Sequence, residues 1–141
     1  MKTGIDLIKD ERERQIEIEG WTLEHDLQHK NNELANAAAT YAMDSDCREA
    51  LTNLIGDCKL LNVPPTWPWN EKWYKPTPEN RIKELVKAGA LIAAEIDRRR
   101  AAKKSLGEWE REFNGLVKQS EGRLAEPYKF NRADAYEEEL A

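Results

Sequence analysis

The first part of the chain has few apolar positions and a dense run of charges, a pattern typical of a helix with a large solvated face. Residues 10–14 are all charged. Thr3 can cap such a helix, with Asp6 three residues later as a short capping box. Gly20 suits the left-handed residue that ends a helix. We therefore predict a helix over residues 3–19.

Two further helices are predicted from their apolar positions. Residues 32–42 are so rich in alanine that almost no polar face is left, which predicts a central helix closely approached by its neighbours. Between residues 44 and 61 the apolar side chains share one helical stripe. This stripe predicts that both cysteines are core residues, because free cysteine is usually buried. Its members are Cys47, Leu51, Leu54, Ile55, Cys58 and Leu61.

Residues 62–78 interrupt the helical pattern. They contain five of the six prolines and three of the five tryptophans. Proline removes backbone donors and fixes φ, so we expect a stiff, extended loop. Long loops in compact domains are either functional or disordered, and the tryptophans favour packing over disorder.

Two helices are expected after this loop. Thr77 as cap and Pro78 at the first helical position predict a helix that ends near residue 104. Its middle, residues 88–94, is apolar all round, which is more than a five-helix monomer easily covers. We therefore expect a homo-oligomer that forms through this helix. A stripe of apolar residues predicts the last helix over 105–120.

The predicted fold class is all-α: a helical bundle of about five helices with a long Pro/Trp-rich loop. Residues 1–120 are expected to form a single helical domain. Residues 121–141 are expected to form a C-terminal tail, because their apolar positions show only a weak pattern. Both a tail that packs on the domain and a disordered tail stay open.

Composition narrows the class of protein. The 141 residues suit one domain, and 40% are apolar, 35% are charged and the net charge is -5. No stretch approaches the roughly 20 apolar residues that a membrane-spanning helix needs, and no signal peptide is expected, which predicts a cytoplasmic location. Two cysteines make a disulfide framework improbable. A pI near 5.2 argues against general nucleic-acid binding.

A first group of candidate chemical residues contains two histidines. His25, His29 and Glu33 recur every four residues and would share one face of a helix that began early. Two imidazoles and a carboxylate can hold a transition metal. In the alternative, Asp26 caps the helix and the histidines bond to the backbone. We favour the alternative and expect no tightly held zinc, because the ligand set is incomplete.

A second group could serve magnesium-dependent nucleotide hydrolysis, which needs several facing carboxylates. The all-α nucleoside-triphosphate pyrophosphohydrolases use a Glu-Glu-x-x-Glu motif answered by Glu-x-x-Asp, and this chain has neither spacing. Magnesium is expected as a cofactor only if this alternative holds. The carboxylates are Glu33, Glu84, Glu95 and Asp97.

The third group combines aromatic and cationic side chains. Trp67, Trp69 and Trp73 occur near Lys75 in the loop, and Trp21 lies in an earlier loop. Aromatic faces stack on planar ligands and cations bind phosphates, so this combination suits a nucleotide or another flat anion. Alternatively the tryptophans clamp the loop to the bundle. We expect that structural role for at least two of the three loop tryptophans.

Several polar and aromatic blocks occur in order between residues 5 and 100. They are Glu11-Arg12-x-Arg14-Gln15, Glu19-Gly20-Trp21-Thr22-x-Glu24-His25-Asp26-x-x-His29, Glu33-Leu34-Ala35-x-Ala37-Ala38, Trp67-Pro68-Trp69, Trp73-x-Lys75-Pro76 and Leu85-Val86-Lys87-Ala88-Gly89-Ala90-Leu91-Ile92-x-Ala94-Glu95-Ile96-Asp97-Arg98. Together they resemble a family of short phage and prophage proteins. The resemblance implies a viral accessory protein in a bacterial host cell and no particular activity. The chain departs from the family at Leu27, where an acidic residue is usual, and at Asn32, where glycine is usual. Leu27 weakens any metal site that depends on paired acids there.

The polar blocks fall between well-patterned helices, which predicts a site. We expect a pocket formed by residues of the first loop, closed by the tryptophan loop and by the long helix that follows it. No catalytic or metal-binding residue is assigned. The candidate ligand-binding residues are Arg12, Trp21, His25, Asp26, His29, Trp69, Trp73, Lys75, Lys87, Glu95 and Asp97.

The leading functional hypothesis is a non-enzymatic binder of a small anionic or nucleotide-like ligand that works as a homo-oligomer. The resemblance adds a role, the sequestration of a nucleotide signal of host defence. Two alternatives stay open. One is the metal-dependent pyrophosphohydrolase, and the other is a protein-binding inhibitor of a host factor that uses the tryptophan loop and the charged tail.

Overall fold

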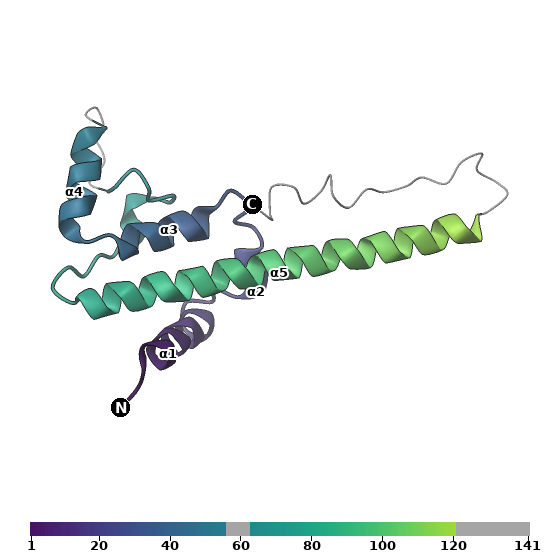
Figure 1. Cartoon of the computed structure of the whole chain (residues 1–141), viewed down its shortest axis with the longest axis horizontal. Helices are drawn as coiled ribbons and strands as arrows, with labels where there is room; N and C mark the ends of the chain where they lie inside the picture. Colours follow the sequence, from purple (N-terminus) through teal and green to yellow (C-terminus); the bar gives the residue numbers. More distant parts are fainter. Residues whose placement is uncertain (56–62, 121–141) are drawn as a thin grey trace. The chain divides into compact units, whose positions relative to one another are not determined.

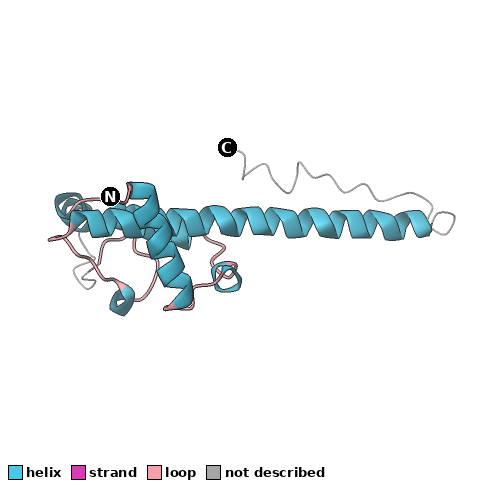
Figure 2. Ribbon diagram, turned by 90° about the horizontal axis from the view of Figure 1, so that it is seen from below, coloured by secondary structure: helices cyan, strands magenta, loops and turns pink. Residues whose placement is uncertain are grey.

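The computed structural model describes residues 1–55 and 63–120. Over these residues the chain has five α-helices, one 3-10 helix and no strand, so the predicted all-α class is confirmed (Figures 1 and 2). The chain divides into two compact units, residues 1–100 and 101–141. The predicted tail lies outside the described residues. The elements are α1 (Gly4–Glu17), α2 (Leu23–Asp26), α3 (Glu33–Ala42), α4 (Ser45–Leu54), the 3-10 helix η1 (Glu71–Trp73) and α5 (Arg81–Gln119).

The ends of α1 follow the sequence prediction. The Thr3 hydroxyl accepts a hydrogen bond from the Asp6 amide at 3.3 Å, and the Asp6 carboxylate accepts one from the Thr3 amide at 2.7 Å. This is the expected capping box. Gly20 adopts the left-handed conformation, with a φ of 73°. The chain then turns back on α1, because the Trp21 amide donates to the Gln15 carbonyl at 3.0 Å.

The earlier loop in which we place Trp21 contains the short helix α2. α2 ends at Asp26 and α3 begins at Glu33. The shared face that His25, His29 and Glu33 would have on a helix that began early is therefore not formed, because the residues between the two helices leave the helical conformation.

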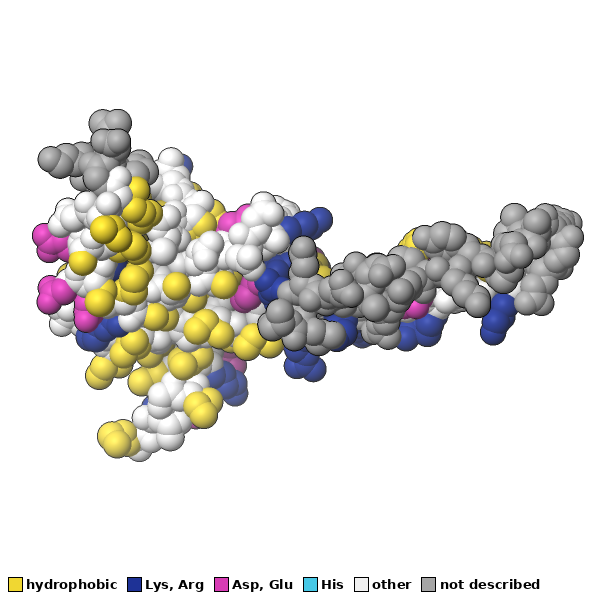
Figure 3. All heavy atoms as spheres, turned by 45° about the horizontal axis from the view of Figure 1, so that its top comes forward, with side chains coloured by type: hydrophobic (Ala, Val, Ile, Leu, Met, Phe, Trp, Pro, Cys, Tyr) yellow, Lys and Arg dark blue, Asp and Glu magenta, His cyan; other side chains and the backbone are white. Residues whose placement is uncertain are grey.

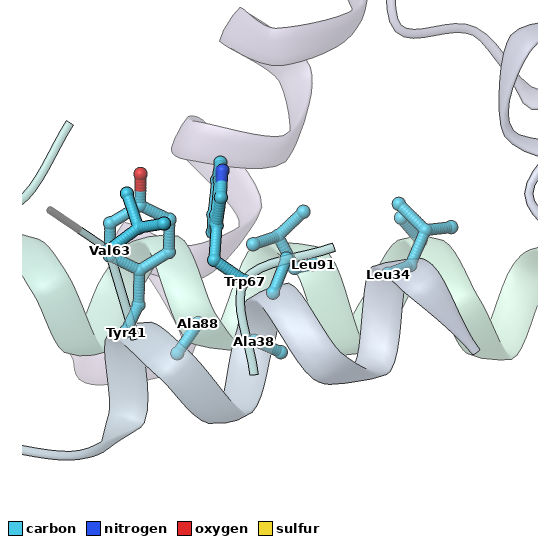
Figure 4. Close-up of a cluster of buried hydrophobic side chains, with 9 residues drawn as sticks. Leu34, Ala38, Tyr41, Val63, Trp67, Ala88 and Leu91 are labelled. Carbon is cyan, nitrogen blue, oxygen red and sulfur yellow. The ribbon is translucent and has the colours of Figure 1, made fainter. Parts of the chain in front are cut away.

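The hydrophobic core of the first unit lies between α3, α5 and the tryptophan loop, residues 63–78 (Figure 4). Leu34 and Tyr41 of α3, Leu91 of α5 and Trp67 of the loop are all buried. Small side chains let the helices approach closely, which confirms the prediction of a central alanine-rich helix. The buried alanines are Ala37, Ala38, Ala88, Ala90 and Ala94.

α4 buries a different face from the one predicted. Cys47 and Leu54 of the apolar stripe are exposed, and the buried residue of this helix is Arg48. The prediction of a core cysteine is thus wrong for Cys47, and Cys58 lies outside the described residues. The physical reason is that Arg48 finds a buried carboxylate, Glu84, on α5.

The helices predicted over 78–104 and 105–120 are one continuous helix, α5. The junction between them carries alanine, lysine, serine and leucine, which a helix accommodates without a break. In the second unit, the rings of Trp109 and Phe113 stack with their centroids 5.2 Å apart.

α5 begins at Arg81 and not at Pro78. The Asn80 amide donates to the Thr77 carbonyl at 2.8 Å, which forms a turn before the helix. The Asn80 side chain then accepts from the Lys83 amide at 3.1 Å and caps the first turn. Asn80 therefore has the role that the sequence pattern assigned to Thr77.

α1 packs against α5 at Gly89. A Cβ atom at this position would lie 2.5 Å from the Ile8 Cδ1 atom, so any larger residue would force Ile8 to move. The absence of a side chain at Gly89 thus sets the close approach of the two helices.

A buried ion pair joins α4 to α5. Glu84 is 0% exposed, and Arg48 donates to its two carboxylate oxygens at 2.7 and 2.8 Å. Arg81 adds a third bond at 3.3 Å and also donates to the carbonyls of Tyr41 and Met43 at the end of α3. Burial opposes the ionisation of Glu84, but the hydrogen bonds and charge of Arg48 outweigh it, so the pKa of Glu84 is lowered.

We expect Glu84→Gln to lower the free energy of unfolding by about 3–5 kcal/mol, because it leaves the Arg48 charge buried without its partner. Urea denaturation followed by far-ultraviolet circular dichroism at neutral pH measures this change. Glu13→Gln is the matched control, since Glu13 is exposed and only loosely paired with Lys9. Its effect should stay within about 0.5 kcal/mol.

The difference between wild type and Glu84→Gln should also depend on pH. Because the pKa of Glu84 lies below its ordinary value of 4.5, its contribution is complete above that pH and is lost as the pH falls through the lowered value. The two denaturation curves should therefore converge in acid. A gap that stays constant into strong acid would contradict this assignment.

Candidate functional site

The first unit contains a cavity of about 860 Å³. Its walls come from α1, α2, the tryptophan loop and α5, together with Leu34 and Tyr41 of α3. The cavity therefore lies where segments far apart in the sequence meet, and its lining combines charged and aromatic side chains.

A buried charge pair forms the wall between α1 and α2. Asp26 is 1% exposed, and the Arg12 Nη2 atom donates to its carboxylate at 2.6 Å. The other guanidinium nitrogen donates to the Trp21 carbonyl at 3.2 Å. The second carboxylate oxygen lies 3.2 Å from the His25 Nδ1 atom. Asp26 is the last residue of α2 and bridges these groups. It is not the cap of the alanine-rich helix that we expected, because Asn32 holds that position at α3.

A continuous run of aromatic rings crosses the cavity wall. The ring centroids of His25 and His29 lie 5.0 Å apart, those of His29 and Trp69 5.2 Å, and those of Trp69 and Trp67 5.4 Å. Trp67 then meets Tyr41 at 5.6 Å. These spacings are those of favourable edge and tilted aromatic contacts. The aromatic run joins α2, the tryptophan loop and α3.

The loop tryptophans have different roles. Trp67 is buried, and its indole N–H donates to the Asn70 carbonyl at 3.1 Å, so it anchors the loop in the core. Trp73 is 59% exposed, and the Lys72 ammonium lies 5.0 Å from its ring centroid. Trp73 therefore lines the cavity without contributing much to the core.

The two arginines that line the cavity are neutralised by acids in the same lining. Arg14 donates to both Glu11 oxygens at 2.9 Å and to Glu19 at 2.9 Å. Arg12 is paired with Asp26. Neither guanidinium therefore contributes much uncompensated charge to the cavity.

Among residues 1–55 and 63–120, no acid contacts Lys87 of α5 in this way. Its ammonium donates to the Lys75 carbonyl at 2.8 Å and lies 5.2 Å from the centroid of the Tyr41 ring. Burial lowers the pKa of Lys87, the charge of Lys83 lowers it further, and Glu11 partly offsets the effect. The ammonium is therefore partly desolvated and is repelled by the charge of Lys83.

Three buried polar atoms of lining residues have no hydrogen-bond partner among the described residues. They are Arg12 Nε, Gln15 Oε1 and Trp69 Nε1. Buried polar groups are normally satisfied. Each of these atoms is a place where a small shift on ligand binding would gain a hydrogen bond.

The structure brings together most of the site residues that the sequence singled out. Two of them are placed elsewhere. Glu95 is buried on α5 and pairs with Arg98 and Arg99 at 2.9 and 2.6 Å, and Asp97 is exposed. These two acids are therefore not among the residues that line this cavity. The nine that line the cavity are Arg12, Trp21, His25, Asp26, His29, Trp69, Trp73, Lys75 and Lys87.

Sequence reasoning missed Gln15, Tyr41 and Lys83, which also line the cavity. For Lys83 a signal was available, because it precedes Lys87 by four residues and must lie on the same face of a helix. The others are ordinary helix residues in the sequence, and only packing directs them to the cavity.

The carboxylates considered for magnesium are not gathered in one place. Glu84 and Glu95 are each engaged by arginines, and the Glu33 carboxylate accepts from the Asn31 amide at 2.7 Å. Among the described residues, no three histidine, cysteine or acidic side chains are grouped as a metal ion would require. The geometry of residues 1–55 and 63–120 thus offers no support to the pyrophosphohydrolase alternative.

No protein-family model, curated protein or solved structure matches this chain. Of the helices in the described part of the chain, none combines the length and the apolar character needed to span a bilayer. We therefore infer the function from the cavity itself.

The division of roles between the tryptophans can be tested by stability alone. Trp67→Ala should lower the free energy of unfolding by about 3–5 kcal/mol, because it removes a buried anchor. Trp73→Ala should cost less than about 1 kcal/mol, because its ring is largely exposed. Urea denaturation followed by circular dichroism compares the two variants. Equal losses would show that both rings clamp the loop.

Proposed function

We propose that the protein binds a small, planar, anionic ligand of the nucleotide class in this cavity. The observation that carries the proposal is the combination of an aromatic wall with an excess of positive charge. Five basic and three acidic side chains line the cavity, although the chain as a whole has a net charge of -5. Aromatic faces suit a base, and cationic groups suit phosphate.

The size of the cavity supports a ligand of this class. At about 860 Å³ it lies within the range of roughly 300–1,000 Å³ that is usual for small-molecule sites. Exposed Trp73 and Lys75 stand at the accessible side of the lining, whereas Trp67 and Asp26 are buried. A flat ligand can thus contact aromatic and basic groups without unfolding the loop.

We further propose that the protein acts by holding its ligand and not by transforming it. The resemblance to phage and prophage proteins supports a role in the cytoplasm of an infected bacterial cell, where a nucleotide signal of host defence would be sequestered.

A panel of nucleotides should therefore include one that quenches tryptophan emission and raises the melting temperature of the wild type by mass action. Trp73→Ala should weaken the binding of that ligand by about 1–3 kcal/mol, which is the range for a base stacked on an aromatic side chain. Lys75→Ala should weaken it as well, by removing charge. Calorimetric titration gives the affinities.

Matched controls separate these effects from a general loss of tryptophan or charge. Trp109→Ala removes a ring from the second unit, and Lys9→Ala removes an exposed lysine that does not line the cavity. Both should bind like the wild type. Wild-type protein that responds to no nucleotide, or unchanged affinity in both cavity variants, would overturn the proposal.

We also propose that the chain forms a homodimer through α5. Large apolar side chains on one face of this helix are exposed, at successive spacings of three, seven and four residues. They are Ile82, Leu85, Ile92 and Ile96, with exposed fractions of 67%, 48%, 49% and 52%. Figure 3 shows apolar side chains, in yellow, exposed among charged ones over the first unit. A continuous exposed stripe is typical of a protein interface.

Light scattering should give the wild type about twice the chain mass of 16.3 kDa at micromolar concentration. Ile92→Glu should give a monomer, because a buried charge without a partner opposes association. Ile18→Glu introduces the same charge at an exposed position outside the stripe and should leave the dimer intact. A monomeric wild type would contradict the assignment.

A further inference from the structure

Three lysines in the cavity lining form no close ion pair with an acid in the part of the chain that the structure describes. Lys75, Lys83 and Lys87 all line the cavity. Among the described residues, no carboxylate oxygen lies within 4.0 Å of their ammonium groups, whereas Arg12 and Arg14 are both paired at that distance. The positive excess of the cavity thus belongs to these lysines.

The lysines are gathered at one corner of the cavity. Lys83 and Lys87 are one helical turn apart on α5, which places them side by side on one face. The backbone carbonyl of Lys75 accepts from the Lys87 ammonium at 2.8 Å, so the tryptophan loop passes Lys87 at the residue that carries its own lysine. Two distant segments thus contribute neighbouring lysine residues to the lining.

The surroundings of this corner favour an anion. Burial and the charge of Lys83 both lower the pKa of Lys87, which means that its charged form is destabilised where it stands. The acid that acts on Lys87 from α1, Glu11, is itself engaged by two hydrogen bonds from Arg14. A bound anion would relieve the repulsion between the lysines.

We propose that Lys75, Lys83 and Lys87 hold the contiguous phosphates of a nucleoside di- or triphosphate whose base lies against the tryptophan wall. This inference rests on the proposed function and specifies its ligand. Lysine acts on phosphate as a compact point charge, and several such charges at one corner match phosphates linked directly to each other. A ligand with phosphates at opposite ends would need the cations distributed between both ends.

The test compares ligands that differ only in phosphate. Calorimetric titration of the full chain uses adenosine, AMP, ADP and ATP, then the guanosine, cytidine and uridine series, with inorganic pyrophosphate and cyclic di-AMP as further probes. In the best-bound series, the diphosphate should bind at least about tenfold more tightly than the monophosphate, as expected for added charge-assisted contacts. Pyrophosphate alone and cyclic di-AMP should both bind more weakly than that diphosphate.

Variants identify the residues. Lys83→Met and Lys87→Met keep an unbranched apolar stem and remove the charge. Each should therefore lower the affinity for the diphosphate at least about tenfold and leave the affinity for the nucleoside unchanged. Lys9→Met is the matched control and should change neither. Because the Lys87 ammonium also contacts the loop, Lys83→Met provides the independent test if Lys87→Met lowers the melting temperature.

The outcomes distinguish the two proposals. If the monophosphate binds more tightly than the nucleoside and as tightly as the diphosphate, the proposed binding function stands and the assignment to contiguous phosphates is refuted. If pyrophosphate alone equals the best nucleotide, or cyclic di-AMP binds more tightly than it, the assignment to a nucleoside polyphosphate is wrong. If no probe binds, both proposals fall together.

Discussion

The buried carboxylate of Glu84 is the point on which the arrangement of the first unit depends. Arg48 neutralises it through two hydrogen bonds of 2.7 and 2.8 Å, and this pair joins α4 to α5. The Tyr74 hydroxyl accepts from Arg48, and the Thr77 amide donates to Glu84, so the tryptophan loop is tied to the same pair. A buried charge that loses its partner costs several kilocalories per mole, so these elements hold one another in place.

The loop held in this way forms one wall of the cavity and determines its charge distribution. The Lys75 amide donates to the Tyr41 hydroxyl at 3.0 Å, and the Lys75 carbonyl accepts from Lys87 at 2.8 Å. The loop and α5 thus present lysines together, whereas α1 presents arginines that are already paired with Asp26 and with acids of its own. The basic side chains on the α1 side of the cavity are therefore paired with acids, whereas the lysines of the loop and α5 are not in close ion pairs among the described residues.

In α5, the sequence predicts that many side chains are buried more readily than it predicts which face of the helix is buried. One face packs Ala88 and Leu91 against α3, and Gly89 admits Ile8 of α1. The lysine face borders the cavity, and the isoleucine stripe is exposed. The apolar composition of this helix predicts contacts with other elements on several sides. Since its apolar residues occur on almost every side, periodicity could not tell which side faces solvent.

The sequence by itself determined the features that depend on near neighbours: the all-α class, the Thr3 capping box, the alanine-rich α3, the proline-rich loop, and the distinctive aromatic and charged residues that line the cavity. Only the tertiary structure decided that Arg48 and not Cys47 is buried on α4, because the neutralising Glu84 is 36 residues away. It also decided that Glu95 turns to Arg98 and away from the cavity. Helical periodicity states which residues share a face. The face that turns inward is chosen by the charge and shape of partners, and these meet only when the chain has folded.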